Sequence, residues 1–183
     1  MHKKFYKEID IVTRLRRSLN KVWPSYWPKK GMPERTEPFT WIVKGKIAAS
    51  WWPDSDLFER FKNEGISIVI NCSEFDNRKD IPQGFIYHHF NVPDYGVPSI
   101  EQVQDFLNLS KSYLQQNRPI VIHCVAGCGR TAQFIVAWAA YHGFIPKNID
   151  PVDWIRIHRP CSLETREQKK FARMIANKFQ HNR

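Results

Sequence analysis

The segment from His123 to Thr131 has residue types and spacing suited to chemistry on an anion. It reads His-Cys-Val-Ala-Gly-Cys-Gly-Arg-Thr, and it lies between the apolar run 119–123 and an apolar stretch after Arg130. A loop of small residues that leads into a helix can direct several backbone N–H groups at one point. Together with the helix dipole, these groups form a cradle for phosphate or another oxyanion.

A thiol at the start of such a loop, that of Cys124, is expected to ionise easily. The backbone N–H groups, the helix N-terminus and Arg130 all favour the thiolate, and cysteines in such settings reach pKa values of roughly 3.5–7.5. The pattern predicts transfer of a phosphoryl group to sulfur, followed by hydrolysis of the thiophosphate. The alternatives are an inert buried cysteine and a redox or structural glycine loop. The residues expected to bind phosphate are Val125, Ala126, Gly127, Cys128, Gly129 and Arg130.

This motif resembles the signature of the cysteine-based protein tyrosine phosphatases, His-Cys-x-x-Gly-x-x-Arg-Ser/Thr. Within that superfamily the chain most resembles the small, atypical dual-specificity phosphatases, over roughly residues 41–179. The resemblance implies that Cys124 is the nucleophile and that Arg130 binds phosphate. It also implies that Thr131 assists breakdown of the thiophosphate and that His123 supports the loop and the thiolate.

A general acid must protonate the oxygen of the leaving group, and the resemblance implies an aspartate on a loop about 30 residues upstream of the cysteine. Asp94 lies in the segment 91–99, which follows a predicted strand and precedes a capped helix. We therefore predict that Asp94 is the general acid, the alternative being an ordinary turn aspartate. Asp76 and Asp80 are rivals by composition, but they lie in a charged loop without this context.

The segment 162–168 resembles the family pattern Glu-Thr-x-x-Gln, which returns to the active site. The resemblance implies that Gln168 helps to place the hydrolytic water and that Glu164 braces the phosphate loop. Thr165 and Gln168 also have the spacing of a capping box, so the start of a helix explains them equally well. Arg159, which precedes a proline, resembles a family residue with a structural role.

The four cysteines form no CxxC pair and have no histidine partner at zinc-finger spacing, so we expect no metal or cofactor. The N-terminus lacks a compact apolar signal region, which predicts a reducing, cytoplasmic location and free thiols. Cys72 ends a predicted central strand, and its thiol could trap an oxidised Cys124 as a disulfide, with Cys128 as the second candidate. The alternatives are core packing for Cys72 and loop filling for Cys128. Cys161 receives no role.

Strand and helix patterns alternate from residue 39 onward. The strands are expected at 41–43, 47–49, 66–71, 86–90 and 119–123. Helices are expected after the caps Asp54, Ser99 and Asp150, over 130–142 and over 164–179. This alternation predicts an α/β domain whose central, mostly parallel sheet of about four or five strands is flanked by helices.

The 183 residues carry 28 Lys/Arg against 18 Asp/Glu, a formal net charge of +10. Residues 1–38 hold ten of those bases and four of the acids, which predicts a basic N-terminal helix and proline-rich arm ahead of a phosphatase-type domain over 39–183. Such an arm suits an anionic surface of nucleic acid or lipid. The alternative is a helix that packs on the domain with solvated charges.

The sequence therefore predicts a monomeric phosphatase for phosphorylated proteins or peptides, with phosphotyrosine-only or dual specificity. An RNA 5′-triphosphatase is an alternative because the isoelectric point is about 9.6. A phosphoinositide phosphatase is another, although Val125, Ala126 and Cys128 add no lysine to the loop. The alternative outside enzymes is a module that only binds phosphorylated ligands.

Overall fold

The computed structural model describes residues 37–180. The predicted basic arm, residues 1–38, lies outside this range except for its last two residues, so its helix and its partner stay predictions. Within residues 37–180, no helix has the length and apolar character needed to cross a membrane.

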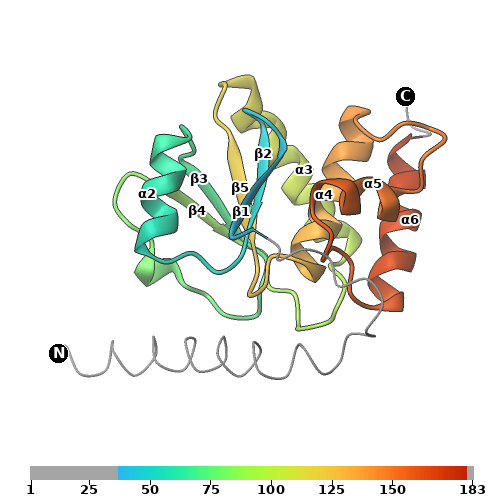
Figure 1. Ribbon diagram of the computed structural model, residues 1–183, viewed down its shortest axis with the longest axis horizontal. Helices are drawn as coiled ribbons and strands as arrows, with labels where there is room; N and C mark the ends of the chain where they lie inside the picture. The colour runs from blue at the N-terminus through green and yellow to red at the C-terminus, as the bar shows by residue number, and fades with distance from the viewer. Residues whose placement is uncertain (1–36, 181–183) are drawn as a thin grey trace. The chain divides into compact units, whose positions relative to one another are not determined.

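A five-stranded sheet forms the centre of the domain (Figure 1), as the sequence predicted. Its strands are β1 (Phe39–Val43), β2 (Ile47–Ser50), β3 (Ile68–Asn71), β4 (Ile86–His89) and β5 (Ile120–His123). Their order in the sheet is β1-β2-β5-β3-β4. Only the β1–β2 hairpin is antiparallel, and the other three pairings are parallel.

Helices cover both faces of this sheet, with α2 on one face and the other four on the opposite face (Figure 1). The helices are α2 (Ser55–Asn63), α3 (Ile100–Gln115), α4 (Gly129–His142), α5 (Pro151–His158) and α6 (Arg166–Gln180). The predicted caps Asp54, Ser99 and Asp150 all accept a backbone hydrogen bond at a helix N-terminus. A short 3-10 turn at Arg78–Asp80 was not predicted.

Burial on both faces explains why the central strands are almost continuously apolar. Val69 and Val121 belong to the smaller apolar cluster, which also contains Leu57, Phe58 and Phe61 of α2. The alternate residues of the same strands face the larger cluster with α3, α4 and α6. They are Ile68, Ile70, Ile120 and Ile122.

The parallel strands β3, β4 and β5 end at the same edge of the sheet. Asn71 at the end of β3 is in register with His89 of β4 on one side and with His123 of β5 on the other. The three loops that follow these residues therefore begin side by side, as ligand-binding loops of open α/β sheets do. They contain Cys72, the segment 91–99 and the phosphate loop.

Candidate active site

The phosphate loop runs from Cys124 to the start of α4, whose N-cap is Cys128. At its centre Gly127 has a φ of +69°, in the left-handed region that favours glycine. A Cβ atom at this position would overlap the carbonyl oxygen of Ser50 on the neighbouring strand. Glycine is required here because both the backbone angle and the packing exclude a side chain.

The thiol of Cys124 lies inside this loop and is 2% exposed. The Gly127 N–H donates a hydrogen bond to its Sγ over 3.2 Å. A hydrogen bond from Cys72 lowers the pKa of the Cys124 thiol well below its ordinary value, with help from Arg130 and Thr131 and against the effect of burial. This shift favours the thiolate, the form that attacks phosphorus.

Cys72 follows β3 directly and lies beside Cys124. Its Sγ lies 3.0 Å from the carbonyl oxygen of His123 and 3.6 Å from Oγ1 of Thr131. Burial raises the pKa of Cys72, and the neighbouring Cys124 raises it further. Of the two adjacent sulfurs, that of Cys72 keeps its proton and that of Cys124 carries the charge.

His123 is completely buried at the end of β5. Its Nδ1 lies 3.1 Å from the carbonyl oxygen of Cys124, and its ring contacts Trp52 edge-on. Burial lowers the pKa of His123 to about 4, so the ring is neutral at physiological pH. It can support the loop by packing and hydrogen bonding, whereas a positive charge beside the thiolate comes from Arg130.

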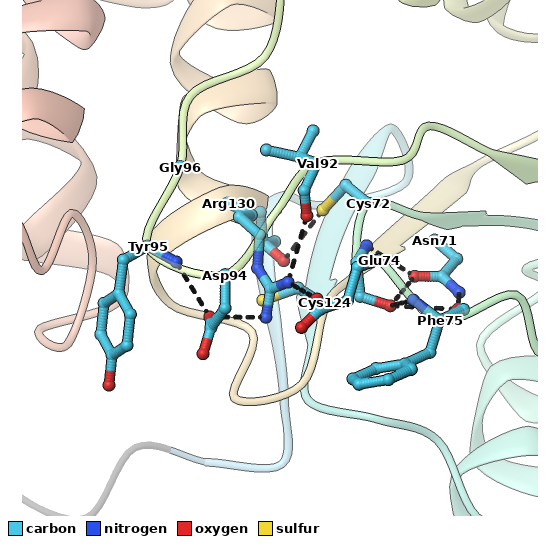
Figure 2. Close-up of polar contacts among 12 residues, drawn as sticks. Asn71, Cys72, Glu74, Phe75, Val92, Asp94, Tyr95, Gly96, Cys124 and Arg130 are labelled. Carbon is cyan, nitrogen blue, oxygen red and sulfur yellow. Dashed lines mark hydrogen bonds and ion pairs between the residues drawn. The ribbon is translucent and has the colours of Figure 1, made fainter.

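Two carboxylates meet the guanidinium of Arg130 (Figure 2). Nη2 pairs with Asp94 Oδ1 at 2.9 Å, while Nη1 pairs with Glu74 and donates to the carbonyl oxygen of Val92. Burial opposes the charge of Arg130, but Cys124, Asp94 and Glu74 raise its pKa. The structure thus brings the predicted acid, the predicted phosphate ligand and the predicted nucleophile to one point.

Glu74 is a residue of this site that the sequence analysis missed. It lies three residues beyond the end of β3, the strand next to β5, and the side-by-side loops at that edge were a signal that could have found it. The rival carboxylate Asp76 instead accepts hydrogen bonds from the backbone N–H of Arg78 and from the Tyr87 hydroxyl. No contact between Asp76 and Arg130 is found among residues 37–180.

The loop that carries Asp94 is held against two helices. Tyr95 N–H donates to Asp94 Oδ1, and Tyr95 itself has a positive φ of 57°. The next carbonyl, that of Gly96, accepts from Nε2 of Gln133 at 3.0 Å and from Nε2 of Gln168 at 3.4 Å. Gln133, on α4, was not singled out from the sequence, because a buried glutamine in a helix has no distinctive pattern.

Gln168 and Glu164 both lie against the phosphate loop. The Oε1 of Gln168 accepts from the N–H groups of Glu164 and Thr165, and Thr165 Oγ1 accepts from the Gln168 N–H, which is the capping arrangement left open by the sequence. The Glu164 carboxylate accepts from the Gly129 N–H. Burial raises the pKa of Glu164 to about 7, and the charges of Cys124 and Asp94 add to this.

The expectation that all cysteines are free thiols is wrong. Cys128 and Cys161 form a disulfide, while Cys72 and Cys124 are free. The two bonded residues are 33 positions apart, but the fold brings their Cα atoms to 5.4 Å, within the usual range for a bridge. Cys128 is therefore not available to Cys124, and Cys161 has a partner that no sequence spacing indicated.

No group of three or more His, Cys, Asp or Glu side chains within residues 37–180 could hold a metal ion.

Comparison with known families identifies one that matches most of the described domain. The family described as "Polymorphic toxin system, DSP-PTPase phosphatase" matches residues 46–144. These residues include β2 through α4, and with them the phosphate loop and the loop of Asp94.

Individual relatives match parts of the chain. The uncharacterised protein MJECL20 of Methanocaldococcus jannaschii is 30% identical over 81 residues, which cover 44% of this chain and 52% of that protein. The mouse dual specificity protein phosphatase CDC14B is 29% identical over 141 residues, 68% of this chain and 28% of that protein. The chain thus spans about half the length of the first relative and less of the second.

Solved structures share the fold. Tk-PTP in its active form has a TM-score of 0.67 at 23% identity, with 76% of this chain and 97% of that chain covered. PTPMT1 in complex with PI(5)P also has a TM-score of 0.67, at 15% identity, with 80% and 99% covered.

Proposed function

This chain belongs to the DSP-PTPase phosphatase family of polymorphic toxin systems, and from this premise we propose that it hydrolyses phosphorylated protein or peptide substrates through a cysteinyl-phosphate intermediate. The observation that carries the proposal is the Cys124 thiolate, buried inside a loop whose Gly127 N–H and Arg130 guanidinium face the same point. An anionic sulfur in an anion-binding loop is suited to attack on a bound phosphate.

In the first step, the thiolate of Cys124 attacks phosphorus. An S–P bond forms while the bond from phosphorus to the substrate oxygen breaks. The loop N–H groups and Arg130 stabilise the charge spread over the other phosphoryl oxygens. Arg130 exchanges its bonds to the carboxylates for bonds to phosphate. Asp94, released from this ion pair, takes up a proton from solvent and then gives it to the leaving oxygen.

In the second step, water hydrolyses the S–P bond. Asp94, now ionised, accepts a proton from the attacking water, and the S–P electron pair returns to Cys124 as a thiolate. The Thr131 hydroxyl hydrogen-bonds to this sulfur and stabilises it as a leaving group. Gln168 contacts the loop of Asp94 through the carbonyl of Gly96. This position near the general acid supports its assignment to placing the hydrolytic water.

Two alternative substrates use the same chemistry. PTPMT1, a structural neighbour, was solved with PI(5)P, so a phosphoinositide is one of them. The loop positions Val125, Ala126 and Cys128 add no cation for further phosphates, and Cys128 is used in a disulfide, so a singly phosphorylated side chain fits better. An RNA 5′-triphosphate and a purely phosphate-binding role are the remaining alternatives.

The cytoplasmic location inferred from the sequence stays a prediction, as do the monomeric state and the anion-binding role of residues 1–38. The Cys128–Cys161 disulfide weighs against the cytoplasm, because such bonds persist mainly in oxidising compartments.

The decisive experiment is phosphate release from a phosphotyrosine peptide in the presence of EDTA, with wild type and Cys124→Ser compared side by side. We expect steady turnover by the wild type and a loss of at least about 10⁴-fold in the variant, since the nucleophile is removed. Phosphoserine peptide, PI(5)P and 5′-triphosphorylated RNA are measured in the same assay. Equal turnover by the two proteins would refute the cysteine mechanism, and faster release from lipid or RNA would replace the protein substrate.

A further inference from the structure

The disulfide joins the phosphate loop to a turn that is distant in the sequence. Cys128 is the N-cap of α4 and the last loop residue before that helix. Cys161 lies between the end of α5 at His158 and the start of α6 at Arg166. Both half-cystines are buried. The bond therefore lies inside the domain, on the side of the loop that faces α5 and α6.

The same turn also holds the loop by hydrogen bonds. The Arg159 guanidinium donates to the carbonyl oxygen of Gly127 over 2.7 Å and to that of Ala126 over 3.3 Å. The Leu163 N–H donates to the carbonyl oxygen of Cys128 over 3.4 Å. The segment 159–163 thus binds three consecutive loop carbonyls, and the disulfide joins the same two segments of the chain.

Holding the carbonyls on one side orients the N–H groups on the other. The C=O and N–H of one peptide group point in opposite directions, because the group is planar and trans. The peptide between Ala126 and Gly127 illustrates this, since its C=O accepts from Arg159 while its N–H donates to Cys124 Sγ. The outer side of the loop is the side whose carbonyl oxygens face the segment 159–163, and the inner side is the one that faces Cys124. Contacts that fix the carbonyls on the outer side therefore direct the N–H groups on the inner side toward the anion.

We propose that the Cys128–Cys161 disulfide is a clamp that keeps the phosphate loop in its anion-binding shape, so that Cys161 is a positioning residue for phosphoryl transfer. The proposal rests on the proposed function and adds a residue outside the signature motif. It implies that reduction lowers the affinity of the loop for anions. With a phosphine as reductant, phosphorus gives two electrons to the disulfide and takes up the oxygen of one water molecule to become a phosphine oxide. The two protons of that water complete the two thiols.

The test separates loop shape from turnover. Tungstate binds phosphate loops without being hydrolysed, so its affinity is measured by calorimetry on Cys124→Ser and on Cys124→Ser with Cys161→Ala. A third sample is Cys124→Ser treated with a phosphine, which is then removed anaerobically. Alkylation and mass spectrometry count the free thiols before and after reduction, and turnover of a phosphotyrosine peptide is measured on the same set with Cys124 restored.

We expect about tenfold weaker tungstate binding and a similar loss of kcat/KM whenever the bond is absent, because small misplacements of binding groups have effects of this size. Reductant should have no further effect on Cys161→Ala. If that variant fails to fold, the reduced protein, which has no substitution at this position, gives the same comparison. All binding is measured well below the melting temperature, where the protein is folded with or without the disulfide. A disulfide that only stabilised the fold would therefore leave the tungstate affinity unchanged.

Two results would overturn the clamp. One is unchanged tungstate affinity in a protein whose two additional thiols are shown to be free after reduction, and the other is a protein in which these thiols are free from the start. Failure of the proposed function has a different signature. The wild type would then release no phosphate, while tungstate binding would still weaken on reduction.

Discussion

The two sides of the phosphate loop use cysteine in opposite ways. On the inner side Cys124 and Cys72 are adjacent but unbonded, and the proton of one stabilises the charge of the other. On the outer side Cys128 and Cys161 are joined covalently, and no ionisable sulfur remains. The difference teaches that one loop needs both reactivity and a fixed shape, and that it obtains them from separate cysteine pairs.

The neighbours of the two pairs follow the same division. The inner side has Asp94, whose proton moves in the proposed reaction, and Arg130, which exchanges carboxylate partners for phosphate. The outer side has Arg159, a buried cation that donates to carbonyl and hydroxyl oxygens among the described residues. Burial lowers the pKa of Arg159 to about 10, so it stays charged at neutral pH and keeps its hydrogen bonds. We therefore expect inner-side substitutions to change chemistry and outer-side substitutions to change anion binding and stability.

The largest effect is expected on the inner side, for Asp94→Asn. Turnover of a phosphotyrosine peptide should fall by about 10²–10⁴-fold, because the leaving oxygen loses its proton donor. An aryl phosphate with a strongly acidic leaving group should be affected far less, and tungstate affinity should not weaken. Steady-state kinetics on both substrates measure this, with Asp80→Asn as the matched control on the 3-10 turn. An equal loss on both substrates would contradict the role of Asp94 as acid.

Arg159→Met tests the outer side. The substitution leaves the buried carbonyl of Gly127 and the partly buried carbonyls of Ala126 and Glu37 without this donor. We expect the free energy of unfolding to fall by about 3 kcal/mol. Tungstate binding should weaken, and kcat/KM should fall by the same factor for good and poor leaving groups. Urea unfolding and calorimetry measure the two effects, with the exposed Arg173→Met on α6 as control. A loss that depended on the leaving group would break the distinction between the two sides.

Cys72→Ala tests whether the inner pair acts through a hydrogen bond. Removing the donor should raise the pKa of Cys124 by about one unit, equivalent to about 1.4 kcal/mol. Cys72→Ser, which keeps a donor, should raise it less. The pH dependence of inactivation by iodoacetate reports this pKa.

The same variants test the predicted redox role of Cys72. A disulfide between Cys72 and Cys124 would protect the nucleophile from irreversible oxidation, so after peroxide and reductant the wild type should recover more activity than either variant. Equal recovery by all three proteins would leave Cys72 as a hydrogen-bond donor only.

The smallest effect is expected for Glu164→Gln and concerns pH. Because the pKa of Glu164 is raised to about 7 from 4.5, the folded protein binds its proton more tightly than the unfolded chain does. Its contribution to stability is full below about pH 4.5 and is lost as the pH rises to about 7. The melting temperature of wild type should therefore decline more steeply over this range than that of Glu164→Gln. Parallel curves would contradict the raised pKa.

The phosphate loop could be predicted from the sequence because the loop is contiguous. Its proposed function depends on the order of small residues between a buried strand and a helix, and that order is visible in nine consecutive positions. The strands and capped helices were predicted for a similar reason, since apolar periodicity and caps such as Ser99 are local signals. Their boundaries differ from the structure by a residue or two, as at β3, which begins at Ile68 rather than at residue 66.

By itself, the amino-acid sequence determined the α/β architecture, the thiolate loop and the loop of Asp94, because each is set by residues close together along the chain. The tertiary structure alone decided that Glu74 pairs with Arg130, that two glutamines hold the carbonyl of Gly96, and that Cys128 is bonded to Cys161. Those contacts join segments that are far apart in the sequence. They arise from strand order and helix packing, which bring distant segments to the same edge of the sheet without leaving a local pattern.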